Sequence, residues 1–350
     1  MTRRAPVLDH LVALSDDVGI AQHAIYDVPN RREGYCTDDV ARAFIVAVAA
    51  SEHGRDRETA LRLGHTYLAF LLDAQRDDGR FHNFMSYGRA WLDEAGTPDS
   101  NGRAIWALGF GARFASRESW RLICTHRIER ALPNVAHLEH VRSKAYAALG
   151  LVHAFDASHR RQRAIESSLR EIASDLTARH SAYATADWDW FENELTYDNA
   201  RLPEALLRIG TVLEDRAIVA LGVRTLAFYE SLCIEDGTFV PIGNAGWYRK
   251  GGTRARYAQQ PLEAASLVDV GLAAEAATGD RRYRRLAEAG LEWFYGRNSR
   301  GVVMTASGGC FDGLEEISVN RNMGAESTLA YLASAFALVQ PGIEVLRIAR

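Results

Sequence analysis

The chain has 350 residues, of which 47% are hydrophobic and 25% are charged. These values are typical of a globular protein and exclude wholesale disorder. The formal net charge of −4 at pH 7 argues against a nucleic-acid binder with a broad basic surface. No apolar run approaches the roughly 18 residues that span a bilayer, so we expect no membrane partner.

The cysteines are few and far apart in the sequence. Cys36, Cys124, Cys233 and Cys310 form no C-x-x-C pair, so neither a disulfide framework nor a zinc or redox motif is indicated. The first residues carry arginines but no apolar signal region behind them. We therefore predict a cytoplasmic protein with no metal and no cofactor.

Apolar residues recur at intervals of three and four along most of the chain, which predicts helices of two kinds. The first kind is apolar on most sides, as buried helices are. It covers residues 38–53, 100–114, 141–156, 199–213, 261–277 and 325–339. The second kind is amphipathic and rich in charge. It covers residues 56–75, 117–131, 159–179, 214–232 and 280–296, with 6–17 as a sixth candidate.

The two kinds alternate, with short turns within each pair and mostly long connections between pairs. The long connections are residues 76–99, 180–198, 233–260 and 297–324. Loops of more than about 15 residues in a compact helical domain are usually functional. If the apolar helices run parallel inside a ring and the charged ones return outside, all long loops share one face. We predict one all-α domain over residues 1–350, an (α/α)6 toroid or barrel of six helical hairpins, with segment 1–36 closing or capping the ring. An open solenoid of hairpins is the alternative.

Polar and aromatic residues cluster at the predicted starts of most of the apolar helices. Helix capping accounts for one oxygen at each start. It does not account for the Asn, Gln, Tyr and Trp residues beside the acids, which together make a surface suited to sugars, because rings stack on C–H faces and amides and carboxylates bond hydroxyls. The predicted saccharide-binding residues are Tyr35, Asp38, Asp99, Asn101, Trp188, Trp190, Asp198, Trp247, Gln260, Glu263, Asn322 and Glu326.

Cleavage of a glycosidic bond needs two carboxyl groups, one to protonate the leaving oxygen and one to activate water or attack directly. Glu192 follows Trp190 and Phe191. An apolar wall raises the pKa of a carboxyl and suits a general acid. Adjacent Asp38 and Asp39 would point about 100° apart on a helix, so only one is expected to face the ring centre. We predict an inverting glycoside hydrolase with Glu192 as acid and Asp39 as base, acting on an oligosaccharide or glycoside.

A basic loop is the second candidate site. Arg249, Lys250, Arg254 and Arg256 surround a Gly-Gly pair, and guanidinium groups with backbone N–H groups are good anion donors. Such a loop would hold phosphate in a glycoside phosphorylase, or an acidic sugar. A solvated loop without a ligand is the alternative.

One short motif, Gln75 to Phe81 with Gly79, resembles the Q-x-x-x-G-x-W/F element of triterpene-cyclase-type toroids. A toroid of that type would enclose an apolar cavity rather than one with carboxylates and amides.

Longer motifs carry a second resemblance. GYCTDD, WDWFENELTYDNARLP, QQPLEA, GGCFDGL and GAESTLAYL occur in that order, and over about residues 5–340 the chain resembles a bacterial six-hairpin glycosidase-like family, often fused C-terminal to glycosyltransferases. The resemblance implies an (α/α)6 barrel with a carbohydrate-related role and a glycosyltransferase as a partner. The positions that it marks here are Asp38, Asp39, Glu192, Asp198, Gln260, Glu263, Asn322 and Glu326.

Two positions depart from the family pattern. Val40 stands where the family has Asn, and Tyr257-Ala258 stands where it has an aromatic residue followed by Asp. The second departure removes one potential acid. A non-catalytic saccharide-binding module that acts with a glycosyltransferase therefore remains an alternative to the hydrolase and the phosphorylase.

Overall fold

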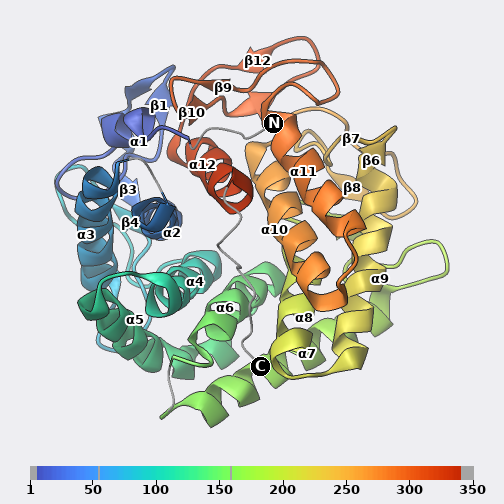
Figure 1. The fold of residues 1–350 in the computed structure, drawn as a ribbon, viewed down its shortest axis with the longest axis horizontal. Helices are drawn as coiled ribbons and strands as arrows, with labels where there is room; N and C mark the ends of the chain where they lie inside the picture. The colour runs from blue at the N-terminus through green and yellow to red at the C-terminus, as the bar shows by residue number, and fades with distance from the viewer. Residues whose placement is uncertain (1–5, 54–55, 158–159, 340–350) are drawn as a thin grey trace.

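The computed structural model describes residues 6–53, 56–157 and 160–339, and these form a double ring of helices (Figure 1). The inner ring consists of α2 (Thr37–His53), α4 (Pro98–Phe114), α6 (Val141–Ala154), α8 (Arg201–Val212), α10 (Pro261–Thr278) and α12 (Ala325–Val339). The outer ring consists of α3 (Arg57–Ala74), α5 (Glu118–Ala131), α7 (Gln162–Tyr183), α9 (Arg216–Cys233) and α11 (Arg282–Phe294). Helix α12 contacts α2, so the ring closes and the predicted (α/α)6 toroid is confirmed over the open solenoid.

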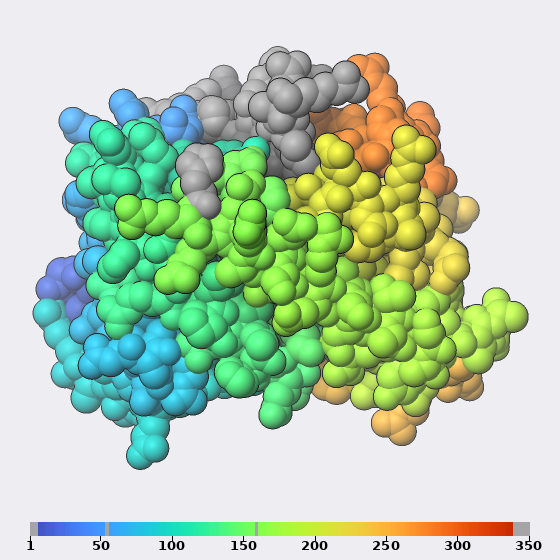
Figure 2. Space-filling view, turned by 90° about the horizontal axis from the view of Figure 1, so that it is seen from below, coloured from blue at the N-terminus to red at the C-terminus, as the bar shows by residue number. Residues whose placement is uncertain are grey.

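The N-terminal segment lies beside the closure of the ring. Helix α1 (Asp9–Leu14) packs against α12 on the outside (Figure 1), where the sequence predicts the sixth outer helix. Residues 1–5 of the predicted capping segment lie outside the described residues. Seen from the side, the chain passes from blue through green to yellow and orange around the wall, so successive hairpins are neighbours (Figure 2).

Local sequence signals fix where several helices begin and end. Thr97 caps α4 by accepting a hydrogen bond from the backbone N–H of Ser100 at 3.1 Å, and Pro98 occupies the first turn. Helix α10 begins at Pro261 and ends at Gly279, which has a φ of 74° that favours glycine. These local start and end signals explain why the observed ends of the helices differ from the predicted ends by only a few residues.

The inner helices α4 and α6 are in backbone contact. A Cβ atom added at Gly109 would collide with the carbonyl of Gly150, and one added at Gly150 would collide with the carbonyl of Ile105. Two facing glycines thus let the helices approach more closely than larger side chains allow. The narrow inner ring depends on this approach.

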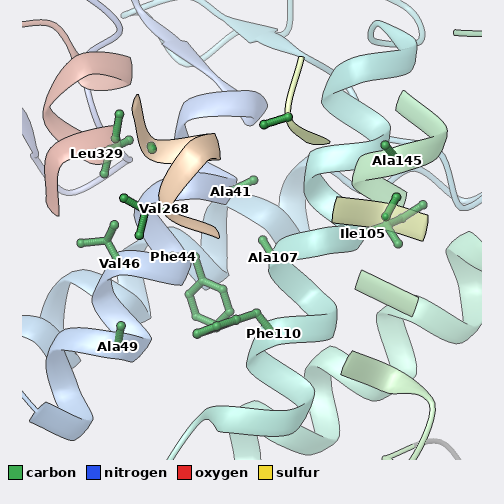
Figure 3. Close-up of a cluster of buried hydrophobic side chains, with 14 of the residues drawn as sticks. Ala41, Phe44, Val46, Ala49, Ile105, Ala107, Phe110, Ala145, Val268 and Leu329 are labelled. Atoms are coloured by element: carbon green, nitrogen blue, oxygen red, sulfur yellow. The ribbon is translucent and has the colours of Figure 1, made fainter. Parts of the chain in front are cut away.

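Aromatic and aliphatic side chains fill the space between the two rings. Phe44 of α2 and Phe110 of α4 are buried and lie close together in Figure 3. Phe44 also packs against Trp120 of α5, with ring centroids 5.7 Å apart. The core therefore continues from the inner wall to the outer ring and fixes the hairpins to each other.

In the described part of the chain, the long loops contain two-stranded antiparallel ladders, of which β3–β4 and β5–β8 join two different loops and the others are hairpins within one loop. The ladders are β1 (Ala24–Ile25) with β2 (Val28–Pro29), β3 (Tyr35–Cys36) with β4 (Phe84–Met85), β5 (Glu194–Leu195) with β8 (Tyr248–Arg249), β6 (Ile234–Glu235) with β7 (Thr238–Phe239), β9 (Thr305–Ala306) with β10 (Gly309–Cys310), and β11 (Gly313–Leu314) with β12 (Val319–Asn320). Two short 3₁₀ turns, η1 (Arg31–Glu33) and η2 (Leu132–His137), complete the connections. The loops before α2, α8, α10 and α12 meet in this way at the inner-helix N-termini, and we call this end the loop face.

The four cysteines are buried and free. Among the described residues, no helix is long and apolar enough to cross a membrane, and no group of His, Cys, Asp and Glu side chains has the geometry of a metal site.

Candidate active site at the inner-helix N-termini

Arg42, in the second turn of α2, gathers three carboxylates at the loop face. Its guanidinium lies 2.6 Å from Asp38, 3.1 Å from Asp39 and 2.9 Å from Glu326 of α12. Asp38 also lies 3.1 Å from Arg103 of α4. The ion pairs thus join three consecutive inner helices across the ring, and this is a direct consequence of closing it.

The carboxylates on Arg42 differ in their surroundings. The side chain of Asp39 is only 7% exposed, whereas that of Glu326 is 41% exposed. Burial raises the pKa of Asp39 to about 6, although Arg42 opposes the shift. Asp38 contacts arginines of both α2 and α4 and is the more exposed member of the Asp pair.

The ion pairs at the loop face form a network of carboxylates and arginines that also includes Arg103 and Arg201. Asp198, in the loop before α8, is the buried centre of this network. It accepts hydrogen bonds from Arg103 at 2.9 Å and Tyr146 at 2.8 Å, and lies 3.3 Å from Arg201. Burial alone would raise the pKa of this carboxyl, but Arg201 and Arg103 hold it below its usual range. Asp198 therefore ties three inner helices together and has no exposed surface for substrate.

Glu263, in the first turn of α10, is also buried. One carboxylate oxygen accepts the backbone N–H of Asp198 and the other accepts the hydroxyl of Tyr229 at 3.0 Å. Burial, with the nearby charge of Asp198, raises the pKa of Glu263 to about 7. Glu263 is 2% exposed and Asp198 has no exposed surface, so neither carboxylate offers a surface for the predicted contact with sugar hydroxyls.

The environment expected for Glu192 is not present. Its carboxylate lies 2.8 Å from Arg142 of α6 and is 27% exposed. Trp190 and Phe191 are fully buried, and Trp190 packs against Tyr229 of the outer ring instead. The apolar wall that favours a general acid at Glu192 is therefore missing, and among the two predicted catalytic carboxyls it is Asp39 that is desolvated.

Most of the predicted stacking aromatics are buried. Tyr35, Trp188 and Trp190 have at most 2% of their surface exposed, and the indole of Trp188 donates to the backbone carbonyl of Glu192 at 2.7 Å. The prediction that they stack on a sugar is wrong, because their rings pack beneath the loops. Trp247 is partly exposed and remains a candidate.

Asp99 and Asn101 lie in the first turn of α4. Asp99 is partly exposed and accepts the hydroxyl of Tyr197 at 2.6 Å. Asn101 is buried and accepts the backbone N–H of Phe81 at 2.9 Å, which fastens the preceding loop. Asp99 keeps a surface that substrate can reach, whereas Asn101 is structural.

Gln260 and Asn322 precede α10 and α12 at the same face. Gln260 is partly exposed and makes no cap hydrogen bond to its helix. Asn322 accepts the backbone N–H of Tyr26 at 3.0 Å and thereby holds the β1–β2 hairpin against the loop before α12. Gln260 therefore stays a candidate for binding, and Asn322 links two loops.

The basic loop does not form a four-residue anion site. Arg254 and Arg256 both pair with Glu235 of β6, Arg256 at 2.6 Å. Arg249 is 80% exposed, and the ammonium of Lys250 donates to a backbone carbonyl of α7 at 3.1 Å. Two of the four guanidinium or ammonium groups therefore share one carboxylate, which removes one of their two positive charges from the loop.

The arginines of the network of carboxylates and arginines were not identified as site residues from the sequence. Arg42 and Arg103 follow Asp38 and Asp99 by four residues, and Arg201 follows Asp198 by three. These are spacings at which side chains of a helix meet. That repeated pattern at the start of inner helices was the signal that could have identified them.

Neither family models nor curated proteins match the chain by sequence. Solved structures do match. The cellobiose 2-epimerase of Bacillus thermoamylovorans is similar over 95% of both chains, with a TM-score of 0.73 and 12% identity. A D-mannose isomerase covers 94% of this chain and 93% of its own, with a TM-score of 0.70 and 11% identity. A family 76 α-mannanase of Bacteroides thetaiotaomicron covers 93% and 92%, with a TM-score of 0.64 and 11% identity. The chain therefore has the (α/α)6 fold that these epimerases, the isomerase and the glycoside hydrolases share.

Proposed function

We propose that the protein is a carbohydrate-active enzyme, a glycoside hydrolase whose acid–base pair is Asp39 and Glu326 on Arg42. One observation carries this proposal. A single guanidinium holds a buried carboxyl with a pKa of about 6 beside a carboxylate that is 41% exposed. Two carboxyls in opposite environments are the usual basis for assigning an acid and a base.

The proposed chemistry is acid–base hydrolysis. Asp39 donates its proton to the leaving glycosidic oxygen as the bond from that oxygen to the anomeric carbon breaks. Glu326 accepts a proton from the water that attacks the same carbon, so the configuration inverts. Arg42 aligns Glu326 through an ion pair of 2.9 Å, and partly exposed Asp38, Asp99 and Gln260 are the proposed partners of the sugar hydroxyls.

The comparisons support a sugar as the substrate. Epimerases, an isomerase and glycoside hydrolases on this fold are all named for action on sugars or glycans. A shared fold at such low identity supports the substrate class by analogy and leaves the reaction to the site.

The test is turnover of an oligosaccharide and aryl-glycoside panel by the full chain, measured as released reducing sugar. We expect Asp39→Asn and Glu326→Gln each to lower kcat by about 100-fold or more. Exposed Glu316→Gln is the matched control and should behave as wild type. Turnover that survives both substitutions would overturn the assignment. Turnover that is lost in Asp39→Asn and Glu192→Gln but kept in Glu326→Gln would restore the pair Asp39 and Glu192.

Two further readouts separate the alternatives. Turnover that requires inorganic phosphate would indicate a phosphorylase. Saturable saccharide binding without any turnover, and unchanged in Glu192→Gln and Asp39→Asn, would indicate a binding module.

Epimerisation or isomerisation is the second candidate, and a specific observation favours it. A carboxyl with a pKa near 6 suits removal of the proton next to a sugar carbonyl, and Arg42, 3.1 Å from Asp39, would stabilise the enolate. The reaction in D2O distinguishes it from hydrolysis. Deuterium would enter a reducing sugar at the carbon beside its carbonyl without cleavage of a glycosidic bond.

A further inference from the structure

A cavity lies on the ring axis, beneath the first turns that carry the carboxylates. It has a volume of about 90 Å³ and opens to solvent, and each inner helix contributes to its wall. Most of the lining is apolar, including Val46, Ala49, Phe110 and Leu329, which Figure 3 labels, and Ala333. A sugar needs a hydrogen-bond partner for each hydroxyl, and the mostly apolar wall of this cavity offers few of them.

Two arginines on the cavity wall have unused donors. Arg103 and Arg208 both border the cavity, and each is only 3% exposed. In each, the Nη1 atom is buried without a hydrogen-bond partner among the described residues. Buried donors are normally satisfied, because leaving one unpaired costs free energy. A missing acceptor in the cavity accounts for both.

The acids around Arg208 leave part of its charge available. Glu204 bonds the Nε atom of Arg208 at 2.7 Å, but its other oxygen bonds Arg201 at 2.6 Å. Asp269 also bonds Arg201, at 2.7 Å. Nη1 of Arg208 therefore has neither of these carboxylates as a hydrogen-bond partner.

We propose that the axial cavity binds an organic carboxylate with an apolar body, whose carboxylate accepts hydrogen bonds from Arg208. A guanidinium with a carboxylate is a strong pair when both are desolvated. The alkyl or aryl body fills the space between Val46, Phe110 and Ala333, and the unused donor of Arg103 faces its upper end. This site lies below the sugar-binding face and does not depend on the proposed function.

The test is isothermal titration of the full chain with octanoate, and with octanol as a neutral analogue of the same length. We expect saturable one-to-one binding of octanoate, and octanol binding weaker by about tenfold or more. Arg208→Met keeps much of the side-chain volume and should lower octanoate affinity by a similar factor. Arg170→Met is the matched control, because Arg170 lies exposed on α7, and it should bind as wild type.

A second variant guards against misfolding of Arg208→Met. Ala333→Leu fills the cavity without removing a charge, so it should abolish octanoate binding while its Tm stays at or above that of wild type. Asp39→Asn should bind octanoate normally, which separates this site from the proposed active site. The proposal is overturned if wild type shows no saturable octanoate binding, if octanol binds as tightly, or if Ala333→Leu binds octanoate like wild type.

Discussion

Asp198→Asn tests whether the buried ion pairs hold the inner ring together. Asp198 is fully buried between Arg103 and Arg201, and its backbone has a φ of 48°. Asparagine tolerates that conformation and keeps the shape of the side chain. The substitution therefore removes the negative charge and little else, and leaves two guanidinium groups without their shared partner.

Removing one partner of a buried ion pair costs about 3–5 kcal/mol of unfolding free energy. We expect about 3 kcal/mol, the lower end of that range, because asparagine retains an oxygen that accepts the hydroxyl of Tyr146. Urea unfolding at pH 7 measures the difference, with the m-value confirming that the same surface is exposed. A loss of this size is a large part of the stability of a typical domain.

The pH dependence of the same variant provides a second check. Because the pKa of Asp198 is lowered on folding, its contribution is fully present above the pKa of the unfolded chain, about 3.9. The contribution is lost as the pH falls through the folded value, so wild type and Asp198→Asn should converge in acid. The control is Asp156→Asn, whose side chain is 62% exposed, and we expect a change within about 0.5 kcal/mol. A loss below about 1 kcal/mol in Asp198→Asn would refute the reasoning.

Three further substitutions test packing, desolvation and burial. Gly150→Ala should cost about 3 kcal/mol of unfolding free energy, because its methyl would meet the carbonyl of Ile105, whereas Gly88→Ala, which has open space, should change little in the same urea assay. Asp39 has a pKa of about 6 when folded, above the unfolded value, so wild type should lose roughly 1 kcal/mol relative to Asp39→Asn between pH 5 and 7.5; a constant difference would contradict this. Trp190→Phe should lower the thermal midpoint of unfolding, because the ring of Trp190 is fully buried. It should leave the affinity for any saccharide found by the panel unchanged. Weaker saccharide binding with an intact fold would show that Trp190 belongs to the binding site.

Helix positions were predictable because they depend on local spacing. The apolar segment predicted at 100–114 is α4, Pro98–Phe114, and that predicted at 325–339 is α12, Ala325–Val339. Periodicity near 3.6 and caps such as Thr97 act within a few residues of chain. The alternation of fully apolar and amphipathic helices likewise indicated which ring each helix joins.

Several site assignments were not predictable because burial and charge pairing are long-range. Arg42 and Glu326 are 284 positions apart and meet only when the ring closes. Trp190 lies among polar residues in the sequence, which suggests an exposed ring. In the structure, Tyr229 of a separate hairpin packs against this ring and helps to bury it. Nothing local distinguishes Asp38, which is partly exposed, from Asp39, which is desolvated.

The sequence by itself determined the helices, their order and the gathering of acids at one end, since each follows from spacing along the chain. Tertiary structure alone decided which acid is buried, which guanidinium neutralises it, and which aromatic rings remain accessible. The physical reason is that desolvation and Coulomb interactions depend on distance in space, and ring closure sets those distances between residues far apart in the chain.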